Sequence, residues 1–183
     1  ALSALIRAYQ YLIARYDVDG FRIDTLKYLP PDTARTFGNA IREYALSIGK
    51  RNFFTYGEVY DEEAKIQAYV GRNTVTDDGD LVGVDAALDF PLFFRLPDVA
   101  KGFRSAEELA GMYRRRRDIG RSVLSNHGDA SRYFVTFLDN HDQYHRIRYV
   151  DPADPTRFDG QVTLALTLLF SLQGIPCVYY GTE

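Results

Sequence analysis

Cysteine, tryptophan and an excess of either charge are scarce in this chain of 183 residues. It has one cysteine, Cys177, and no tryptophan, and its 22 Lys and Arg residues nearly balance 25 Asp and Glu. A single cysteine forms no internal disulfide and no thiolate metal site, and it occurs in cytosolic and secreted proteins alike, so the compartment stays open. A net charge of -3 lacks the basic surplus of nucleic-acid-binding proteins, so we expect no nucleic-acid partner.

Long apolar runs are also missing. The longest nearly apolar stretch, 162–172, is interrupted by two threonines and a serine. It is much shorter than the roughly 20 apolar residues that a membrane span needs, so we expect no membrane partner. Otherwise the composition, 46% hydrophobic and 26% charged, is that of an ordinary folded domain.

Strand-like and helix-like segments alternate along the chain. Short apolar runs predict strands at 20–24, 53–59, 85–94, 133–138 and 175–180. Helical spacing of apolar residues, with Pro, Asp and Gly boundary signals, predicts helices at 2–16, 30–49, 61–71, 105–126 and 160–172. This alternation predicts an α/β fold with a parallel sheet built from right-handed βαβ units.

Two local signals bear on the element boundaries. Pro91 predicts that the third strand ends at a bulge or a sheet edge, because proline cannot donate a ladder hydrogen bond. Ser105, with Glu108 three residues later, is a capping box that predicts the start of the long helix. Five strands fit either an open doubly wound sheet or a segment of a (β/α)8 barrel, and length alone favours the open sheet, since a complete barrel takes about 250 residues.

Ionisable side chains stand where the predicted strands end. Asp24 ends the first strand, Glu58 ends the second and Asp142 follows the fourth. Ligand sites of parallel α/β folds lie at this carboxyl edge of the sheet. A lone Asp there is more often a helix cap, but Glu58 is embedded in an apolar strand, which is costly unless the group is used or paired. Arg22 shares a strand face with Asp24 and would hold that carboxylate ionised.

Four segments in this order resemble signature segments of the α-amylase family, glycoside hydrolase family thirteen. They are 20–24 (Gly-Phe-Arg-Ile-Asp) with Lys27, 57–59 (Gly-Glu-Val), 140–142 (Asn-His-Asp) and 174–183 (Gly-Ile-Pro to Gly-Thr-Glu). The resemblance implies a partial TIM (β/α)8 barrel running from the third barrel helix through strand eight. Residues 1–183 would then be the C-terminal part of one catalytic domain, with no second domain.

The resemblance also implies roles for individual residues. Asp24 would be the nucleophile, Glu58 the general acid and base, and Asp142 the group that stabilises the transition state. Arg22 would orient Asp24, and His141 would bind hydroxyls of the sugar whose bond is cleaved. Lys27 would contact the leaving-group sugars.

This sequence departs from the family pattern just after Lys27. Where the family often has His, this chain has Tyr28, whose ring could instead stack on a sugar. Tyr60 and Tyr144, which also lie just beyond carboxylate strand ends, are further candidates for stacking.

The resemblance implies a retaining glycoside hydrolase that acts on α-glucosidic bonds of starch-like or malto-oligosaccharide substrates. Retention needs a nucleophilic carboxylate and a carboxylic acid about 5 to 5.5 Å apart, which the ends of neighbouring strands can provide. The chemistry needs no metal or other cofactor. A structural calcium would be bound by residues upstream of this chain in the family.

Other functions are alternatives to this one. An α-glucan transglycosylase of the same family would use the same residues. A non-catalytic accessory barrel would be expected to lack one of the three carboxylates. In a Mg²⁺-dependent barrel enzyme, Arg22 would oppose the metal. A cation-binding turn at Asp77, Asp78 and Asp80 is less favoured than a simple turn, since no EF-hand loop is present.

The chain reads as an excerpt, because its first residues already have helical spacing and its last ones follow an apolar strand. We therefore expect the 183 residues alone to have little glycosidase activity. The first and last strands would be unpaired edges of an open barrel, through which the chain would associate with itself.

Overall fold

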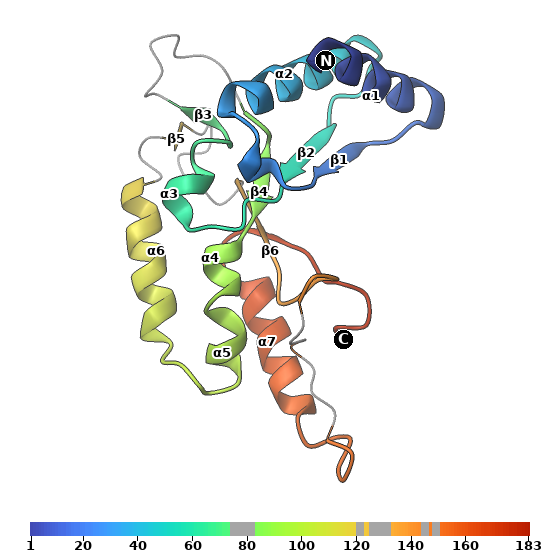
Figure 1. Ribbon diagram of the computed structural model, residues 1–183. Helices are drawn as coiled ribbons and strands as arrows, with labels where there is room; N and C mark the ends of the chain where they lie inside the picture. Colours follow the sequence, from blue (N-terminus) through green and yellow to red (C-terminus); the bar gives the residue numbers. More distant parts are fainter. Residues whose placement is uncertain (74–82, 120–122, 125–132, 144–146, 148–150) are drawn as a thin grey trace.

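The computed structural model describes residues 1–73, 83–119, 123–124, 133–143, 147 and 151–183. One or more helices lie between successive strands of the main sheet along these ranges (Figure 1). The elements are α1 (Leu2–Tyr16), β1 (Gly20–Ile23), η1 (Leu26–Tyr28), α2 (Pro31–Ser47), β2 (Phe54–Gly57), α3 (Glu63–Ile66), β3 (Arg72–Asn73), β4 (Ala86–Leu88), α4 (Phe90–Phe93), α5 (Leu96–Ala100), α6 (Glu107–Ile119), β5 (Val123–Leu124), β6 (Phe134–Thr136), α7 (Asp159–Ser171) and β7 (Ile175–Pro176).

The main sheet has five parallel strands in the order β1-β2-β4-β6-β7, which confirms the predicted parallel α/β fold. Each strand pairs with the next main-sheet strand along the chain. A doubly wound sheet would reverse its direction of growth at a switch point, whereas a (β/α)8 barrel adds each strand beside the last. The strand order therefore confirms the partial barrel that the family resemblance implied, rather than the open sheet that length alone favoured. A separate antiparallel pair joins β3 to β5.

Successive side chains of β1 point to opposite faces of the sheet, as the strand period requires. Phe21 and Ile23 pack against α1 and α2, where Ile13, Phe37 and Ile41 are buried. Figure 1 shows these two helices lying together over the β1–β2 side of the sheet. Arg22 points to the other face.

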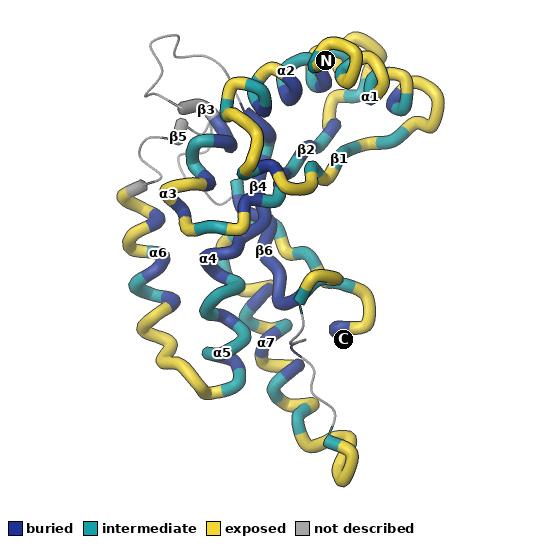
Figure 2. The backbone as a smooth tube through the Cα atoms, in the orientation of Figure 1, coloured by how far each residue is buried: buried dark blue, intermediate teal, exposed yellow. Residues whose placement is uncertain are grey.

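The opposite face carries an apolar interior around the central strands. Its buried members and the side chains packed on them are Ala86, Leu88, Phe90, Val135, Phe137, Phe54, Tyr56, Phe93, Phe94, Ile175 and Cys177. Strands β4 and β6 are buried throughout, whereas β1 is partly exposed (Figure 2). Arg22 aligns with Tyr56 and then Ala86 in the strand register, so it stands at the border of this interior.

The predicted strand at 85–94 is wrong in its second half. Strand β4 ends at Leu88, and Phe90–Phe93 forms helix α4. The buried Asp89 carboxylate accepts the Leu92 amide and caps this helix, and Pro91 sits in its first turn, where no backbone donor is needed. Proline therefore marks a helix start here rather than a bulge. A short apolar run does not distinguish the two by its period.

The long helix also differs from its prediction. Helix α6 ends at Ile119, although the spacing predicted an end at residue 126, and residues 120–122 and 125–132 lie outside the described ranges. Ser105 Oγ accepts the Glu107 amide at 3.2 Å, as a helix cap does. The Glu108 carboxylate pairs with Arg104 at 2.9 Å instead of completing the capping box.

Helix α1 buries a narrower stripe than its spacing suggested. Ile13 is buried, but Leu5 and Tyr16 are 49% and 63% exposed. Among the described helices, none combines the length and the apolar character needed to cross a membrane.

Candidate active site

Arg22 brings the first two predicted carboxylates together at the carboxyl edge of the sheet. Its Nη1 atom lies 2.9 Å from Asp24 Oδ1, which confirms that the two side chains share a face. Its Nη2 atom lies 3.3 Å from Glu58 Oε2 on the neighbouring strand. One guanidinium therefore contacts two carboxylates, one through each of its Nη atoms. The planar, forked donor group of arginine allows this.

The residue directly after Asp24 has a left-handed backbone conformation. Thr25 has φ 51° and ψ 30°, which is costly for a β-branched residue and occurs mostly where surrounding structure imposes it. This turn brings the Thr25 amide to 3.3 Å from Glu58 Oε2. Glu58 thus accepts from both Arg22 and a backbone amide that the turn aims at it.

The two carboxylates differ in their surroundings. The Asp24 side chain is 65% exposed and the Glu58 side chain is 18% exposed. Hydrogen bonding to Glu58, the hydrogen bond and charge of Arg22, and the charge of His141 lower the pKa of Asp24, although burial opposes them. Asp24 is therefore held in the ionised form that a nucleophile needs.

Lys27 lies on the next turn of chain and connects the two strand ends. Its Nζ atom donates to the Tyr60 carbonyl at 2.8 Å and lies 3.8 Å from Asp61 Oδ2. Its backbone amide donates to the Glu58 carbonyl at 3.3 Å. The buried Tyr69 hydroxyl stabilises this turn, because its single proton is shared between the carbonyl oxygens of Lys27 and Leu29, which lie 2.9 and 3.0 Å from the hydroxyl oxygen.

A pocket of about 260 Å³ opens beside Glu58. Its lining residues are Thr25, Lys27, Tyr28, Glu58 and Tyr60. Tyr28 is 76% exposed and Tyr60 is 49% exposed, and both rings lie within 6 Å of the Lys27 ammonium. The pocket therefore presents a carboxyl group, a cation and two partly exposed aromatic rings side by side.

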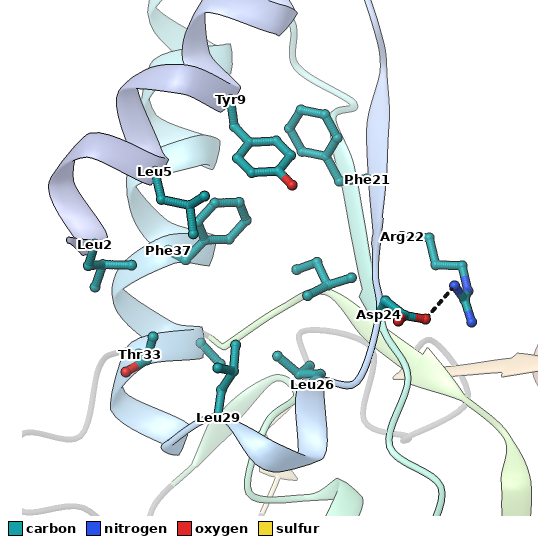
Figure 3. Close-up of a pocket in the computed structure, with 12 residues that line it drawn as sticks. Leu2, Leu5, Tyr9, Phe21, Arg22, Asp24, Leu26, Leu29, Thr33 and Phe37 are labelled. Atoms are coloured by element: carbon teal, nitrogen blue, oxygen red, sulfur yellow. Dashed lines mark hydrogen bonds and ion pairs between the residues drawn. The ribbon is translucent and has the colours of Figure 1, made fainter.

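A second pocket, of about 240 Å³, lies behind Asp24 between α1, β1 and α2 (Figure 3). Tyr9, Phe21, Phe37 and several leucines line it, and Figure 3 shows Arg22 and Asp24 at its margin, joined to each other. Its walls are mainly hydrocarbon and offer few partners for sugar hydroxyls. The pocket beside Glu58 is the one that presents ionisable side chains together with aromatic rings.

His141 and Asp142 lie beyond β6. His141 Nε2 is 3.1 Å from Asp142 Oδ2, and both side chains are about half exposed. The Asp142 amide donates to Asn140 Oδ1 at 2.9 Å, which shapes the turn that presents the pair. The charge of His141 contributes to the lowered pKa of Asp24. Within the described ranges, the contacts of Asp142 are with His141 and Asn140 of the same turn. Tyr144, Asp77, Asp78 and Asp80 lie outside the described residues.

One residue that stabilises the turn at 139–142 was not predicted from the sequence. Asp139 is 1% exposed, and its Oδ2 accepts the Ile147 amide at 3.1 Å. Its Oδ1 accepts the Thr182 hydroxyl at 2.5 Å, which ties the turn to the end of the chain. Its position could have indicated this role, because Asp139 directly follows an apolar strand, as Asp24 does.

Arg22 occupies the position between Asp24 and Glu58 that a bridging cation would take. Within the described ranges, no three His, Cys, Asp or Glu side chains form a group that could hold a metal ion. The described residues therefore offer an ionised carboxylate, a less exposed second carboxyl and fixed donors. Such a set of groups can supply a nucleophile and a proton donor.

Comparisons with known proteins identify the family of this chain. The family model of the α-amylase catalytic domain matches residues 2–183. An α-amylase from Streptomyces lividans is 30% identical over all of this chain, and a cyclomaltodextrin glucanotransferase from Klebsiella oxytoca is 28% identical over 96% of it. The crystal structure of an Anoxybacillus α-amylase matches 99% of this chain with a TM-score of 0.70 and 27% identity. This chain spans 19%, 29% and 35% of those three proteins, respectively. The chain belongs to the α-amylase family, because the model of that family's catalytic domain matches nearly all of it.

Proposed function

We propose that this chain supplies the catalytic carboxylates of a retaining glycosidase that cleaves α-glucosidic bonds of starch-like or malto-oligosaccharide substrates. The observation that carries the proposal is the shared contact of Asp24 and Glu58 with Arg22 at neighbouring strand ends. In the first step, Asp24 attacks the anomeric carbon while Glu58 gives its proton to the leaving oxygen. In the second step, Glu58 takes a proton from water, which displaces Asp24 from the sugar.

The remaining residues would bind and orient the sugars. His141 and Asp142 would donate to and accept from hydroxyls of the ring being cleaved, with contacts that tighten as the oxocarbenium-like state forms. Lys27, Tyr28 and Tyr60 line the pocket beside Glu58, which we assign to the leaving-group sugar. In this scheme the chemical step runs on carboxyl groups, and a calcium bound elsewhere in the protein would act only on stability.

Transfer to a sugar acceptor is the second candidate function. The Klebsiella relative is a glucanotransferase, and two accessible tyrosine faces beside Glu58 suit an acceptor sugar that competes with water. Hydrolysis and transfer share the first step. They differ in whether water or an acceptor sugar then enters this pocket and displaces Asp24.

Azide rescue in the full-length protein tests the proposal. A Glu58→Ala variant retains Asp24, so with α-maltosyl fluoride and azide it should form maltosyl azide of retained configuration. An Asp24→Ala variant should give either no product or the inverted azide. Wild-type products from starch, pullulan and sucrose then identify the linkage and the acceptor. Retained azide from the Asp24→Ala variant would remove Asp24 from the nucleophile's role.

A further inference from the structure

A buried ion cluster lies apart from the catalytic residues. Arg116 on α6 is 6% exposed, and its partners Asp89 and Glu63 are 0% and 3% exposed. Its Nη1 and Nη2 atoms lie 2.9 and 2.5 Å from the two Asp89 carboxylate oxygens, and Nη2 lies 3.4 Å from Glu63 Oε1. Apolar side chains of similar volume would often stabilise such a site as well or better, so stability alone is a weak explanation for the cluster.

The cluster joins segments that follow different strands. Asp89 follows β4 and caps α4 through the Leu92 amide. Glu63 begins α3, a few residues after Glu58 at the end of β2. The Arg116 guanidinium also lies 3.7 Å from the centre of the Phe134 ring on β6. Arg116 thus contacts one residue that follows β2, one that follows β4 and one on β6, and these three strands are neighbours in the sheet.

Glu63 ends the segment 59–63, which we call the acid loop because it directly follows Glu58. Two other contacts attach the acid loop to the same region. The Tyr60 ring centre lies 4.6 Å from that of Phe90 on α4. The Glu62 carboxylate contacts the Arg95 guanidinium at 3.0 and 3.4 Å, and Arg95 Nη1 donates to the Pro91 carbonyl of α4. The acid loop is therefore fixed to α4, the helix that Asp89 caps.

We propose that Arg116 is a positioning residue that holds the acid loop against α4, and so places Tyr60 and the Lys27 contact on the leaving-group side of Glu58. Arg116 lines neither pocket of the site and acts through Glu63 and Asp89. This inference rests on the proposed function for its effect on catalysis, but the placement of the acid loop is a separate structural claim. A substrate with a sugar leaving group needs this placement, whereas a glycosyl fluoride does not.

Arg116→Lys tests the proposal in the full-length protein. Lysine keeps the charge, so Asp89 is not left unpaired, but its ammonium cannot reproduce the paired contacts of a guanidinium. Arg114→Lys is the matched control, because Arg114 lies on the same helix and pairs with Glu107 on the exposed surface. We expect kcat/KM for maltoheptaose to fall about tenfold to hundredfold in Arg116→Lys, largely through KM, while that for α-maltosyl fluoride changes by less than about twofold.

Hydrogen exchange gives a readout that does not depend on activity. Amides of the acid loop should exchange faster in Arg116→Lys than in the wild type or Arg114→Lys, with other regions unchanged. If Arg116→Lys does not fold, Glu63→Gln serves instead, since it weakens the link to the acid loop and leaves the Arg116–Asp89 pair in place. Equal losses on both substrates together with unchanged exchange would overturn the proposal. A wild type that cleaves neither substrate would refute the proposed function, and exchange would still decide whether Arg116 holds the acid loop.

Discussion

Arg22 on β1 contacts Glu58 across the strand boundary, with 3.3 Å between Nη2 and Oε2. The other end of the same guanidinium contacts Asp24. The positions of the Asp24 and Glu58 carboxylates thus both depend on Arg22. A change at Arg22 should therefore affect the nucleophile and the acid together.

Asp24→Asn should abolish turnover without unfolding the protein. The amide has nearly the shape of the carboxylate but is not a nucleophile, so we expect kcat to fall by about 10⁴-fold or more. Circular dichroism and the Tm should stay close to those of the wild type. Asp32→Asn is the control, because the Asp32 side chain is 90% exposed on α2, where it pairs with Arg35. Wild-type turnover by Asp24→Asn would contradict the assignment.

Arg22→Met should move the acidic limb of the kcat/KM profile to higher pH. Asp24 must be ionised to attack, so activity is lost as pH falls through its pKa. Arg22 is one of the groups that lower this pKa. Removing its hydrogen bond and charge raises the pKa towards the ordinary aspartate value, and the limb follows it upwards. A limb that stays in place or moves to lower pH would show that Arg22 does not control the ionisation of Asp24.

Removal of metal ions should leave the chemical step intact. Arg22 already supplies the positive charge beside Asp24 and Glu58. After dialysis against a chelator, the single-turnover rate on α-maltosyl fluoride should be unchanged at temperatures where the protein stays folded, while a structural calcium would show itself only in the Tm. The prediction fails if the rate is lost from folded protein and returns with a metal bound by Asp24 and Glu58.

Gly57→Ala should destabilise the protein through the turn behind the nucleophile. A Cβ atom at Gly57 would lie 2.1 Å from Leu26 Cδ2 and 3.1 Å from Leu26 Cβ, and Leu26 is only 1% exposed. Overpacking of this kind costs about 1–3 kcal/mol in the free energy of unfolding. Urea titration measures it. Gly111→Ala on α6 is the control, because its nearest neighbour lies at 3.5 Å and alanine should stabilise the helix by about 0.5–1 kcal/mol.

A polypeptide of these 183 residues alone should self-associate and show little activity. In the described sheet, β1 and β7 are the edge strands. Unpaired strand edges offer backbone groups to a second copy. Analytical ultracentrifugation should find dimers or larger species, and turnover of α-maltosyl fluoride should stay close to that of the Glu58→Gln variant. A monomer with the turnover of a complete family member would contradict both expectations.

The sequence by itself determined the features that depend on local spacing. The five strands of the main sheet lie within the predicted runs, because apolar alternation and flanking helices are short-range patterns. The pairing of Arg22 with Asp24 followed from the two-residue period of a strand, and the structure confirms it. The family followed from four short segments whose residues are contiguous, and the family comparison confirms it.

Tertiary structure alone decided the features that join distant residues. The spacing of apolar residues left both an open sheet and a barrel segment possible. The family resemblance implied the barrel, and the observed pairing of the strands confirms it. The capping residue of helix α4, Asp89, has its ionic partner Arg116 27 positions away. The contact between Arg22 and Glu58 spans 36 positions, and that between Arg116 and Glu63 spans 53. The energy of such pairs depends on burial and on distances that only packing sets, so sequence spacing does not reveal them.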